Sequence, residues 1–278
     1  MLAHTQSASP TISFSLTSFD HPGASSTDAV GINKAGVIVG YYTDTGGVTQ
    51  GVARLPNGTF DRIDYPGAAF TALYRINDSN QLVGYYQLSD GNAHGFMFNL
   101  PNQFTPINYP GAYQTKAFGI NNSGQIVGEC YDSSRNKFGF SLLNGTYTKL
   151  VYPNSTTTQA TDVNTAGLIS GGWKDSASVA HGFLLTSAVN GTYSDVDYPG
   201  AAGTQVYGIN DLSQVVGEYK RSDNVGHGWA GVSASNQFIN HDYPGSIACQ
   251  VDGITSADRV SGQCKRGRKP FGWLLFFN

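Results

Sequence analysis

Several ionisable side chains stand where a repeated segment breaks its own pattern. The segment ends in Gly-Ile-Asn or a close variant, and its glycine is replaced by Arg75 in one copy and by Asp162 in another. The position before that glycine is aromatic in three copies but is Asp252 in the last copy. Charged exceptions in a repeated segment can orient a bound molecule or give it a proton. These positions are therefore the first candidates for chemistry.

Neighbouring positions of the same segment would suit the body of a ligand. One position is aromatic, and another, two residues earlier, is mostly polar. Aromatic walls with a few orienting polar groups are typical of small-molecule pockets. We predict catalytic or orienting roles for Arg75, Asp162, Asp252 and Lys116, and ligand contacts for Tyr74, Phe118, Tyr207, Gln159, Gln205 and Gln250. The alternative is that Arg75 pairs with Asp162 or Asp252 and fills the centre of the fold structurally.

The elements that must position these residues form one repeat of roughly 44 residues. An Asp-Tyr-Pro-Gly-Ala motif or a relative recurs with its proline at Pro22, Pro66, Pro110, Pro153, Pro199 and Pro244. Gly-Ile-Asn follows, then an apolar stretch ending in glycine, then His-Gly-Phe or a relative. Asparagine and glycine favour tight turns between these stretches, and proline ends the strand before it. Four short strands in each repeat are the signature of a β-propeller blade.

The two ends of the chain predict how the ring closes. The chain opens with a lone strand at 12–20 and ends on a third-strand segment at 271–277 with no fourth strand after it. Pairing these ends would remove two exposed sheet edges. We therefore predict an all-β, six-bladed propeller over residues 12–278, with four-stranded antiparallel blades and the last blade closed by the N-terminal strand. Residues 1–11 are expected to be disordered, and we expect only the innermost strands to meet at the axis.

His94, His181 and His227 recur at one position of the repeat and could be taken for metal ligands. They fall on the third strand of three different blades, roughly 10 Å outside the innermost strand if strands lie about 4.8 Å apart. At that radius they would not converge, so we predict hydrogen bonds within each blade. Motifs of serine hydrolases, zinc peptidases, phosphate-binding loops and Cys-X-X-Cys centres are absent from the sequence. We predict neither a metal nor a cofactor.

Two of the three cysteines leave two alternatives open. Cys249 and Cys264 fall on the first two strands of the last blade, at nearly opposite positions. They could form a disulfide, which would imply an oxidising compartment, or remain small buried thiols. Cys130 occupies the position of Cys264 in the third blade, where it has no such partner.

Composition limits the partners that the protein could have. A net charge of −3 and 13% charged residues argue against a nucleic-acid partner, and no apolar stretch is long enough for a membrane helix. Asn-X-Ser/Thr sequons, the first at Asn57, give weak support for a secretory route. We expect a secreted protein or one of the secretory pathway, with its signal absent from this sequence. The oligomeric state stays open, and a homo-oligomer is one alternative.

The combination of Tyr-Pro-Gly-Ala, Gly-Ile-Asn-X-X-Gly-X-Ile-Val-Gly and His-Gly-Phe resembles the HAF-type extracellular repeat family from about Asp20 to Trp273. That resemblance implies a repeat fold and export but says little about activity. The lone six-bladed chain, its low charge and its sequons also resemble the fungal propeller hetero-Diels–Alderases of tropolone-sesquiterpenoid biosynthesis. This second resemblance implies a cycloaddition between small apolar molecules of polyketide or terpenoid type.

Two functions follow from these observations, and a third is the plain structural alternative. An enzyme of the cycloaddition type would need a pocket that positions its reactants and a hydrogen bond or general acid that polarises one of them. A secreted, non-catalytic module for glycans or cell-surface partners would instead carry equivalent shallow sites on each blade. An extracellular propeller with a filled channel would have neither. The sequence favours the enzyme.

Overall fold

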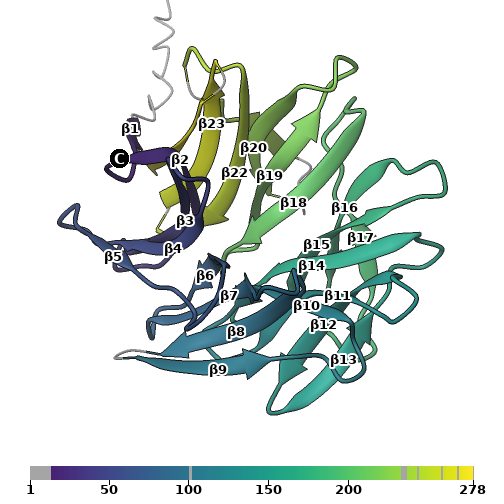
Figure 1. Cartoon of the computed structure of the whole chain (residues 1–278). Coiled ribbons are helices and arrows are strands. Elements are labelled where there is room, and N and C mark those ends of the chain that lie inside the picture. Colours follow the sequence, from purple (N-terminus) through teal and green to yellow (C-terminus); the bar gives the residue numbers. More distant parts are fainter. Residues whose placement is uncertain are drawn as a thin grey trace, which may run out of the picture.

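The computed structural model describes residues 14–99, 102–232, 237–242, 244–257, 259–267 and 269–277. They form six antiparallel sheets of four strands, arranged in a ring (Figure 1). This confirms the predicted all-β, six-bladed propeller. The expectation for residues 1–11 lies outside the described residues. The described residues contain no helix long and apolar enough to span a membrane.

Each blade runs outward from the axis in chain order. Blade 1 contains β2 (Ala24–Ile32), β3 (Ile38–Asp44), β4 (Thr49–Arg54) and β5 (Phe60–Arg62), blade 2 contains β6 (Phe70–Ile76), β7 (Gln81–Gln87), β8 (Ala93–Asn99) and β9 (Gln103–Ile107), and blade 3 contains β10 (Gln114–Ile120), β11 (Ile126–Tyr131), β12 (Lys137–Leu143) and β13 (Thr146–Leu150). Blade 4 contains β14 (Thr157–Val163), β15 (Ile169–Lys174), β16 (Ala180–Leu185) and β17 (Tyr193–Asp195), and blade 5 contains β18 (Gly203–Ile209), β19 (Gln214–Lys220), β20 (Gly226–Val232) and β21 (Gln237–Asn240).

The last blade is completed by the other end of the chain, as predicted. It contains β22 (Ala248–Ile254), β23 (Arg259–Arg266), β24 (Lys269–Phe277) and, at its outer edge, β1 (Phe14–Phe19). Residues 14 to 19 pair in antiparallel register with residues 277 to 272. In Figure 1 the purple N-terminal strand lies beside the yellow last blade. The ring is therefore held by strand pairing rather than by loops.

Every innermost strand carries a β-bulge at the same place. In β6 the pairing with β7 shifts between Leu73 and Arg75, and the same shift occurs in β2, β10, β14, β18 and β22. The bulge residue is thus Tyr74, Phe118, Tyr207 or Asp252 in four blades, and Val30 or Thr161 in the other two. A bulge adds one residue to one strand and re-aims the side chains around it. This allows both Tyr74 and Arg75 to line the central cavity, although they are adjacent in sequence.

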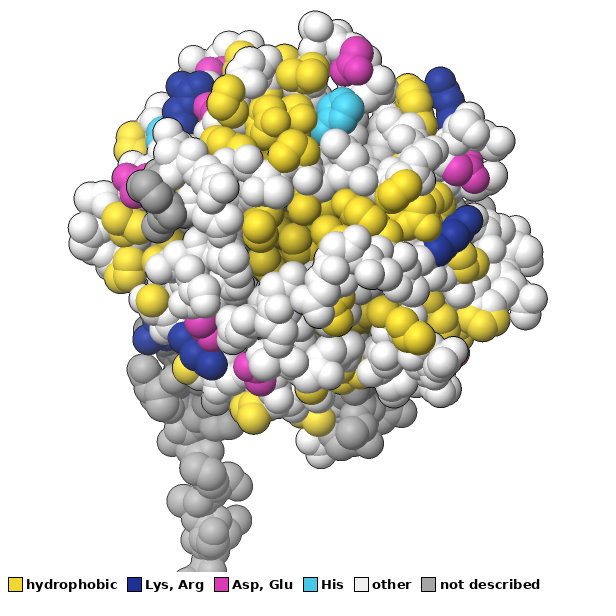
Figure 2. Space-filling model, turned by 90° about the horizontal axis from the view of Figure 1, so that it is seen from below, with side chains coloured by type: hydrophobic (Ala, Val, Ile, Leu, Met, Phe, Trp, Pro, Cys, Tyr) yellow, Lys and Arg dark blue, Asp and Glu magenta, His cyan; other side chains and the backbone are white. Residues whose placement is uncertain are grey.

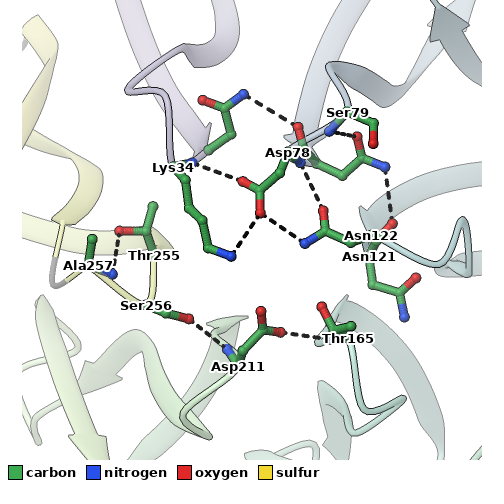
Figure 3. Close-up of polar contacts among 12 residues, drawn as sticks. Lys34, Asp78, Ser79, Asn121, Asn122, Thr165, Asp211, Thr255, Ser256 and Ala257 are labelled. Atoms are coloured by element: carbon green, nitrogen blue, oxygen red, sulfur yellow. Dashed lines mark hydrogen bonds and ion pairs between the residues drawn. The ribbon is translucent and has the colours of Figure 1, made fainter.

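The Gly-Ile-Asn asparagine joins neighbouring blades at one mouth of the channel. The Asn121 Oδ1 accepts the backbone N–H of Gln125 in its own turn, and its Nδ2 donates to the carbonyl of Asn164 in the next blade at 2.8 Å. The same inter-blade bond recurs from Asn33 through Asn210. A second chain of contacts links the same blades through Lys34, Asp78 and Asn122, and Figure 3 shows both. The repeated asparagine therefore has a structural role.

The Asp-Tyr-Pro and His-Gly-Phe motifs recur together because they bond to each other. Asp242 accepts the backbone N–H of Gly228 at 3.0 Å, and its other oxygen lies 2.7 Å from the His227 Nδ1. Asp197 does the same with His181 and Gly182. The hydrogen-bonding role predicted for these two histidines is present. The described residues hold no group of three or more metal-ligating side chains.

Candidate functional site at the propeller axis

Arg75 crosses the axis and closes the channel. Its guanidinium donates to the backbone carbonyls of Val30 at 2.6 Å, Tyr207 at 2.6 Å and Asp252 at 2.7 Å, and its Nε lies 2.9 Å from the Asp162 Oδ2. One side chain from blade 2 therefore binds blades 1, 4, 5 and 6. The inner edges of the innermost strands have no further strand to pair with, so their carbonyls need such donors.

Asp162 holds Arg75 in place from the other side. Its Oδ2 also accepts the backbone N–H of Ile209 at 3.1 Å, and the residue is 5% exposed. Asp162 faces the small polar vestibule at the asparagine mouth rather than the cavity on the opposite side of Arg75. The structural alternative for this pair, a plug, is therefore present. The plug separates the channel into two unequal parts.

The neighbouring glycines explain why the channel can be filled by one side chain. A Cβ on Gly208 would lie 2.7 Å from the Asp252 carbonyl oxygen and 3.0 Å from an Arg75 nitrogen. Glycine at this position leaves room for the guanidinium. Arg75 and Asp162 replace the glycine of Gly-Ile-Asn in their own blades. Their side chains fit at the axis because the other blades keep a glycine at this position.

On the Tyr-Pro-Gly side of the plug lies a cavity of about 380 Å³. This volume lies within the range of small-molecule pockets. Its lining includes aromatic rings from three innermost strands and two second strands, and polar groups from all six blades. Of the predicted residues, Arg75, Lys116, Asp252, Tyr74, Phe118, Tyr207, Gln159 and Gln250 line it, together with Val30, Tyr41, Glu129, Tyr131, Lys137, Thr161 and Gln263. Asp162 and Gln205 lie outside this lining.

The expectation that only innermost strands reach the site is too narrow. Glu129 and Tyr41 come from second strands, and Lys137 from a third strand. Glu129 is the register partner of Lys116, and Tyr41 that of Asp28. The sequence could have indicated Tyr41 and Glu129, because the position after the Ile-Val-Gly glycine varies between repeats. It is occupied by Tyr41, Tyr85, Glu129, Gly172, Glu218 and Gln263.

Asp252 combines burial with an unused oxygen. Its Oδ1 accepts the Gln250 Nε2 at 2.7 Å, whereas its buried Oδ2 has no hydrogen-bond partner among the described residues. Burial raises the pKa of this carboxyl to about 8, against the lowering effects of Gln250 and Arg75. Asp252 is therefore mostly a neutral acid at pH 7, with a proton that is available for a hydrogen bond.

The carboxyls near Asp252 differ in their ionisation. Burial raises the pKa of Asp28 to about 6, while the charge of Lys265 opposes the rise. Burial also raises the pKa of Glu218, which accepts the Tyr207 hydroxyl at 3.1 Å. At pH 7 Asp28 is mostly ionised and Asp252 mostly protonated. Separated pKa values within one group of carboxyls are typical of functional sites, and also occur in structural networks.

The opposite wall, in blades 3 and 4, is cationic. The Glu129 carboxylate is 3% exposed and binds two ammonium groups, Lys116 at 3.0 Å and Lys137 at 2.5 Å. Lys137 also donates to the Gln159 Oε1. Burial is the largest single effect on the pKa of Lys116 and lowers it, but the charge and hydrogen bond of Glu129, together with Tyr85 and Tyr131, raise the pKa overall. Lys116 is therefore a cation at neutral pH and not a free amine nucleophile.

The disulfide alternative for the last blade is the one present. Cys249 and Cys264 are register partners in β22 and β23 and are bonded. Cys249 stands where the other innermost strands have a threonine whose hydroxyl accepts a backbone N–H six residues earlier, as Thr115 does from Tyr109. The Cys130 thiol is buried and contacts the Thr115 hydroxyl.

Comparison with known proteins shows the fold alone. No family model matches the sequence, and no curated protein matches it. Structural neighbours include virginiamycin B lyase from Staphylococcus aureus, at 10% identity and a TM-score of 0.52 over 96% of this chain and 100% of that one. AofleA from Arthrobotrys oligospora has 8% identity and a TM-score of 0.54 over 99% and 95%. A variant of the Aleuria aurantia lectin in complex with Fucα1-6GlcNAc has 11% identity and a TM-score of 0.55 over 89% and 91%.

These neighbours include a lyase and a lectin in complex with a sugar, so the shared architecture does not specify a function. The molecular surface carries few charged side chains, as expected from the low fraction of charged residues in the sequence. Figure 2 shows hydrophobic patches among polar and backbone atoms, with few charged side chains. The residues that distinguish this chain are those of the axial cavity, because the repeated motifs are used in bonds within and between blades.

Proposed function

We propose that the axial cavity binds one small molecule with an apolar body and that protonated Asp252 donates a hydrogen bond to an acceptor oxygen on it. Two observations carry this proposal: Asp252 is one of the residues that line the cavity, and its buried Oδ2 has no hydrogen-bond partner among the described residues. A buried polar group without a partner costs free energy, and a ligand oxygen would satisfy it. The rings of Tyr74, Phe118 and Tyr207 would contact the apolar body.

Calorimetric titration with 2-acetylnaphthalene, which has an aromatic body and one ketone oxygen, tests this binding. We expect one molecule per chain. The dissociation constant should rise about tenfold per pH unit above pH 8, because only the protonated carboxyl can donate. Asp252→Leu, which has no donor, should bind more weakly at pH 7. Asp252→Asn keeps an N–H donor at this position and should bind with no such pH dependence. Asp211→Asn, the same change at the opposite mouth, should leave the profile unchanged. Absence of binding would overturn the proposal.

We further propose that the reaction served is a cycloaddition of the hetero-Diels–Alder type. Such a reaction needs two reactants held in a reactive pose and a hydrogen bond that withdraws electrons from one of them. The cavity offers aromatic walls for the first and Asp252 for the second. No redox step or covalent intermediate is required, because two bonds form in one closed electron shift.

Enantioselectivity measures this reaction separately from binding. An ortho-quinone methide generated in solution reacts with an electron-rich alkene to give a racemic adduct. We expect an excess of one enantiomer with the native protein, and a large loss of that excess with Asp252→Leu, which removes the donor. Asp211→Leu at the opposite mouth is the control. A racemic product at saturating protein would exclude the cycloaddition and leave the binding proposal standing.

A glycan-binding module is the second candidate, because structural neighbours include a lectin in complex with a fucosylated disaccharide. It would use repeated residues and bind several sugars per chain. Titration with fucose derivatives distinguishes the two, since several equivalent sites would favour the module. We propose an exported protein in either case, which the disulfide between Cys249 and Cys264 supports.

A further inference from the structure

We propose that the ligand of the axial cavity is an anion, with a carboxylate or similar group at the end opposite its hydrogen-bond acceptor. This inference rests on the proposed function and specifies the class of molecule. The evidence for it is a cluster of three charged side chains in the cavity lining, namely Lys116, Lys137 and Glu129. These side chains take no part in the hydrogen bond proposed for Asp252.

The lining of the cavity has more cations than anions. Arg75, Lys116 and Lys137 are cationic, and Glu129 is the anion that faces them. The charge of Arg75 is matched by Asp162 behind it, at 2.9 Å. The single negative charge of Glu129 then faces the positive charges of two lysines, Lys116 and Lys137. The side chains of both lysines are about four-fifths buried. A surplus cation in a partly desolvated wall is costly until an anion binds it.

The lysines have the geometry and the free donors to bind such a group. Each ammonium has three N–H donors. Among the described residues Lys116 donates to Glu129, and Lys137 to Glu129 and Gln159. The Lys116 ammonium also lies 5.1 Å from the centre of the Tyr85 ring, which fixes it above an aromatic surface. Donors therefore remain on Lys116 for a ligand that enters the cavity.

The ring geometry places the two polar ends of the ligand on opposite walls. Asp252 belongs to blade 6 and Lys116 to blade 3, and these blades face each other across a six-membered ring. Tyr74 of blade 2 and Phe118 of blade 3 line the same cavity, and their ring centroids lie 4.8 Å apart. The cavity thus suits a molecule with an acceptor oxygen, an apolar middle and an anionic head.

A matched pair of probes tests the charge. 6-Acetylnaphthalene-2-carboxylate and its neutral carboxamide differ at the head group, and both keep the ketone for Asp252. At pH 7 and low salt we expect the carboxylate to bind roughly tenfold more tightly, or better, because a hydrogen bond to a charged group is stronger than a neutral one. That preference should fall as ionic strength rises.

Substitutions in the lysine cluster test which side chains cause the preference for the carboxylate. Lys116→Met should reduce the preference for the carboxylate to near unity, with little change in carboxamide affinity. Glu129→Gln should increase the preference, because it removes the competing carboxylate and leaves both lysines. Lys149→Met, a lysine of the same blade that contacts Phe138 and lies outside the cavity lining, should change neither affinity.

The outcomes separate this inference from the proposed function. Equal binding of carboxylate and carboxamide, at one per chain, would overturn the anionic head group and leave the cavity as a binding site. A preference for the carboxylate that Lys116→Met and Glu129→Gln leave unchanged would place the anion elsewhere and also overturn the inference. Failure of 2-acetylnaphthalene to bind would instead overturn the proposed function itself.

Discussion

Arg75 and Asp162, from blades 2 and 4, meet across the propeller axis with 2.9 Å between the guanidinium Nε and a carboxylate oxygen. Both are nearly fully buried, at 6% and 5% exposure. The pair divides a continuous channel into a polar vestibule and a cavity with a charged floor. The cavity can be a site with one entrance because this pair closes its other end.

Replacing Arg75 should therefore affect folding before it affects binding. Arg75→Met leaves the Asp162 carboxylate buried without its cation and removes a donor from three carbonyls. We expect the free energy of unfolding to fall by about 3–5 kcal/mol, as for other broken buried ion pairs. Urea denaturation followed by fluorescence measures it. Arg75→Met with Asp162→Asn should be more stable than Arg75→Met alone, and a single variant within about 1 kcal/mol of the native protein would contradict the plug.

Asp252 should make the protein less stable as the pH rises. Its pKa is about 8 in the folded state and 3.8 in the unfolded reference, so the folded state binds one more proton between these values. The stabilising contribution is complete below the lower value and is lost as the pH rises through the higher one. We expect the difference in unfolding free energy between pH 5 and pH 8.5 to be smaller in Asp252→Asn than in the native protein. Equal differences in the two proteins would show that this carboxyl titrates normally.

The sequence predicts the fold well because each repeat carries its own turn and strand signals. The Asn-X-X-Gly turns and the Tyr-Pro-Gly ends recur with a nearly constant period, and the lone strand at 12–20 matches the missing outer strand of the last blade. The breaks at Arg75 and Asp252 also identify the axis correctly, because symmetry explains the repeated positions and leaves the exceptions.

The sequence predicts the content of the site less well, for two physical reasons. Whether Arg75 binds a ligand or fills the channel depends on carbonyl positions in three other blades, which no local pattern gives. Glu129 and Lys137 were missed because they lie on outer strands. Their approach to Lys116 follows from the pairing register and the length of the lysine side chain.

A second disulfide should form at the equivalent position in blade 3. Thr115 and Cys130 are register partners separated by 15 residues, as are Cys249 and Cys264. Thr115→Cys should oxidise with the loss of two hydrogens. The bond should stabilise by about 3 kcal/mol in the chain-entropy model, and loss of the hydroxyl that binds the Tyr109 N–H should cost about 1 kcal/mol.

Intact mass, thiol titration and thermal melting with and without reductant measure the outcome for Thr115→Cys. We expect a rise in the melting temperature that reductant abolishes. Thr115→Ser keeps the hydroxyl and should show no effect of reductant at this position. If the thiols at position 115 and at Cys130 both stay free after oxidation of the Thr115→Cys variant, the two blades are not equivalent at this position.

The series of asparagine hydrogen bonds between neighbouring blades ends at Thr255. Adding the missing bond between blades 6 and 1 should stabilise the ring. Thr255 keeps the turn function, since its hydroxyl accepts the N–H groups of Ala257 and Arg259, but it has no amide to donate to the Asn33 carbonyl of blade 1. Thr255→Asn would supply that donor at the junction where the first and last blades meet. We expect a gain of about 1 kcal/mol and a melting temperature higher by about 2–4 °C. Asn121→Ala, which removes the equivalent bond to Asn164, should shift it the opposite way. A Thr255→Asn protein that melts at or below the native temperature would show that blades 6 and 1 are joined by other contacts, such as the one from Arg259 to the Lys34 carbonyl.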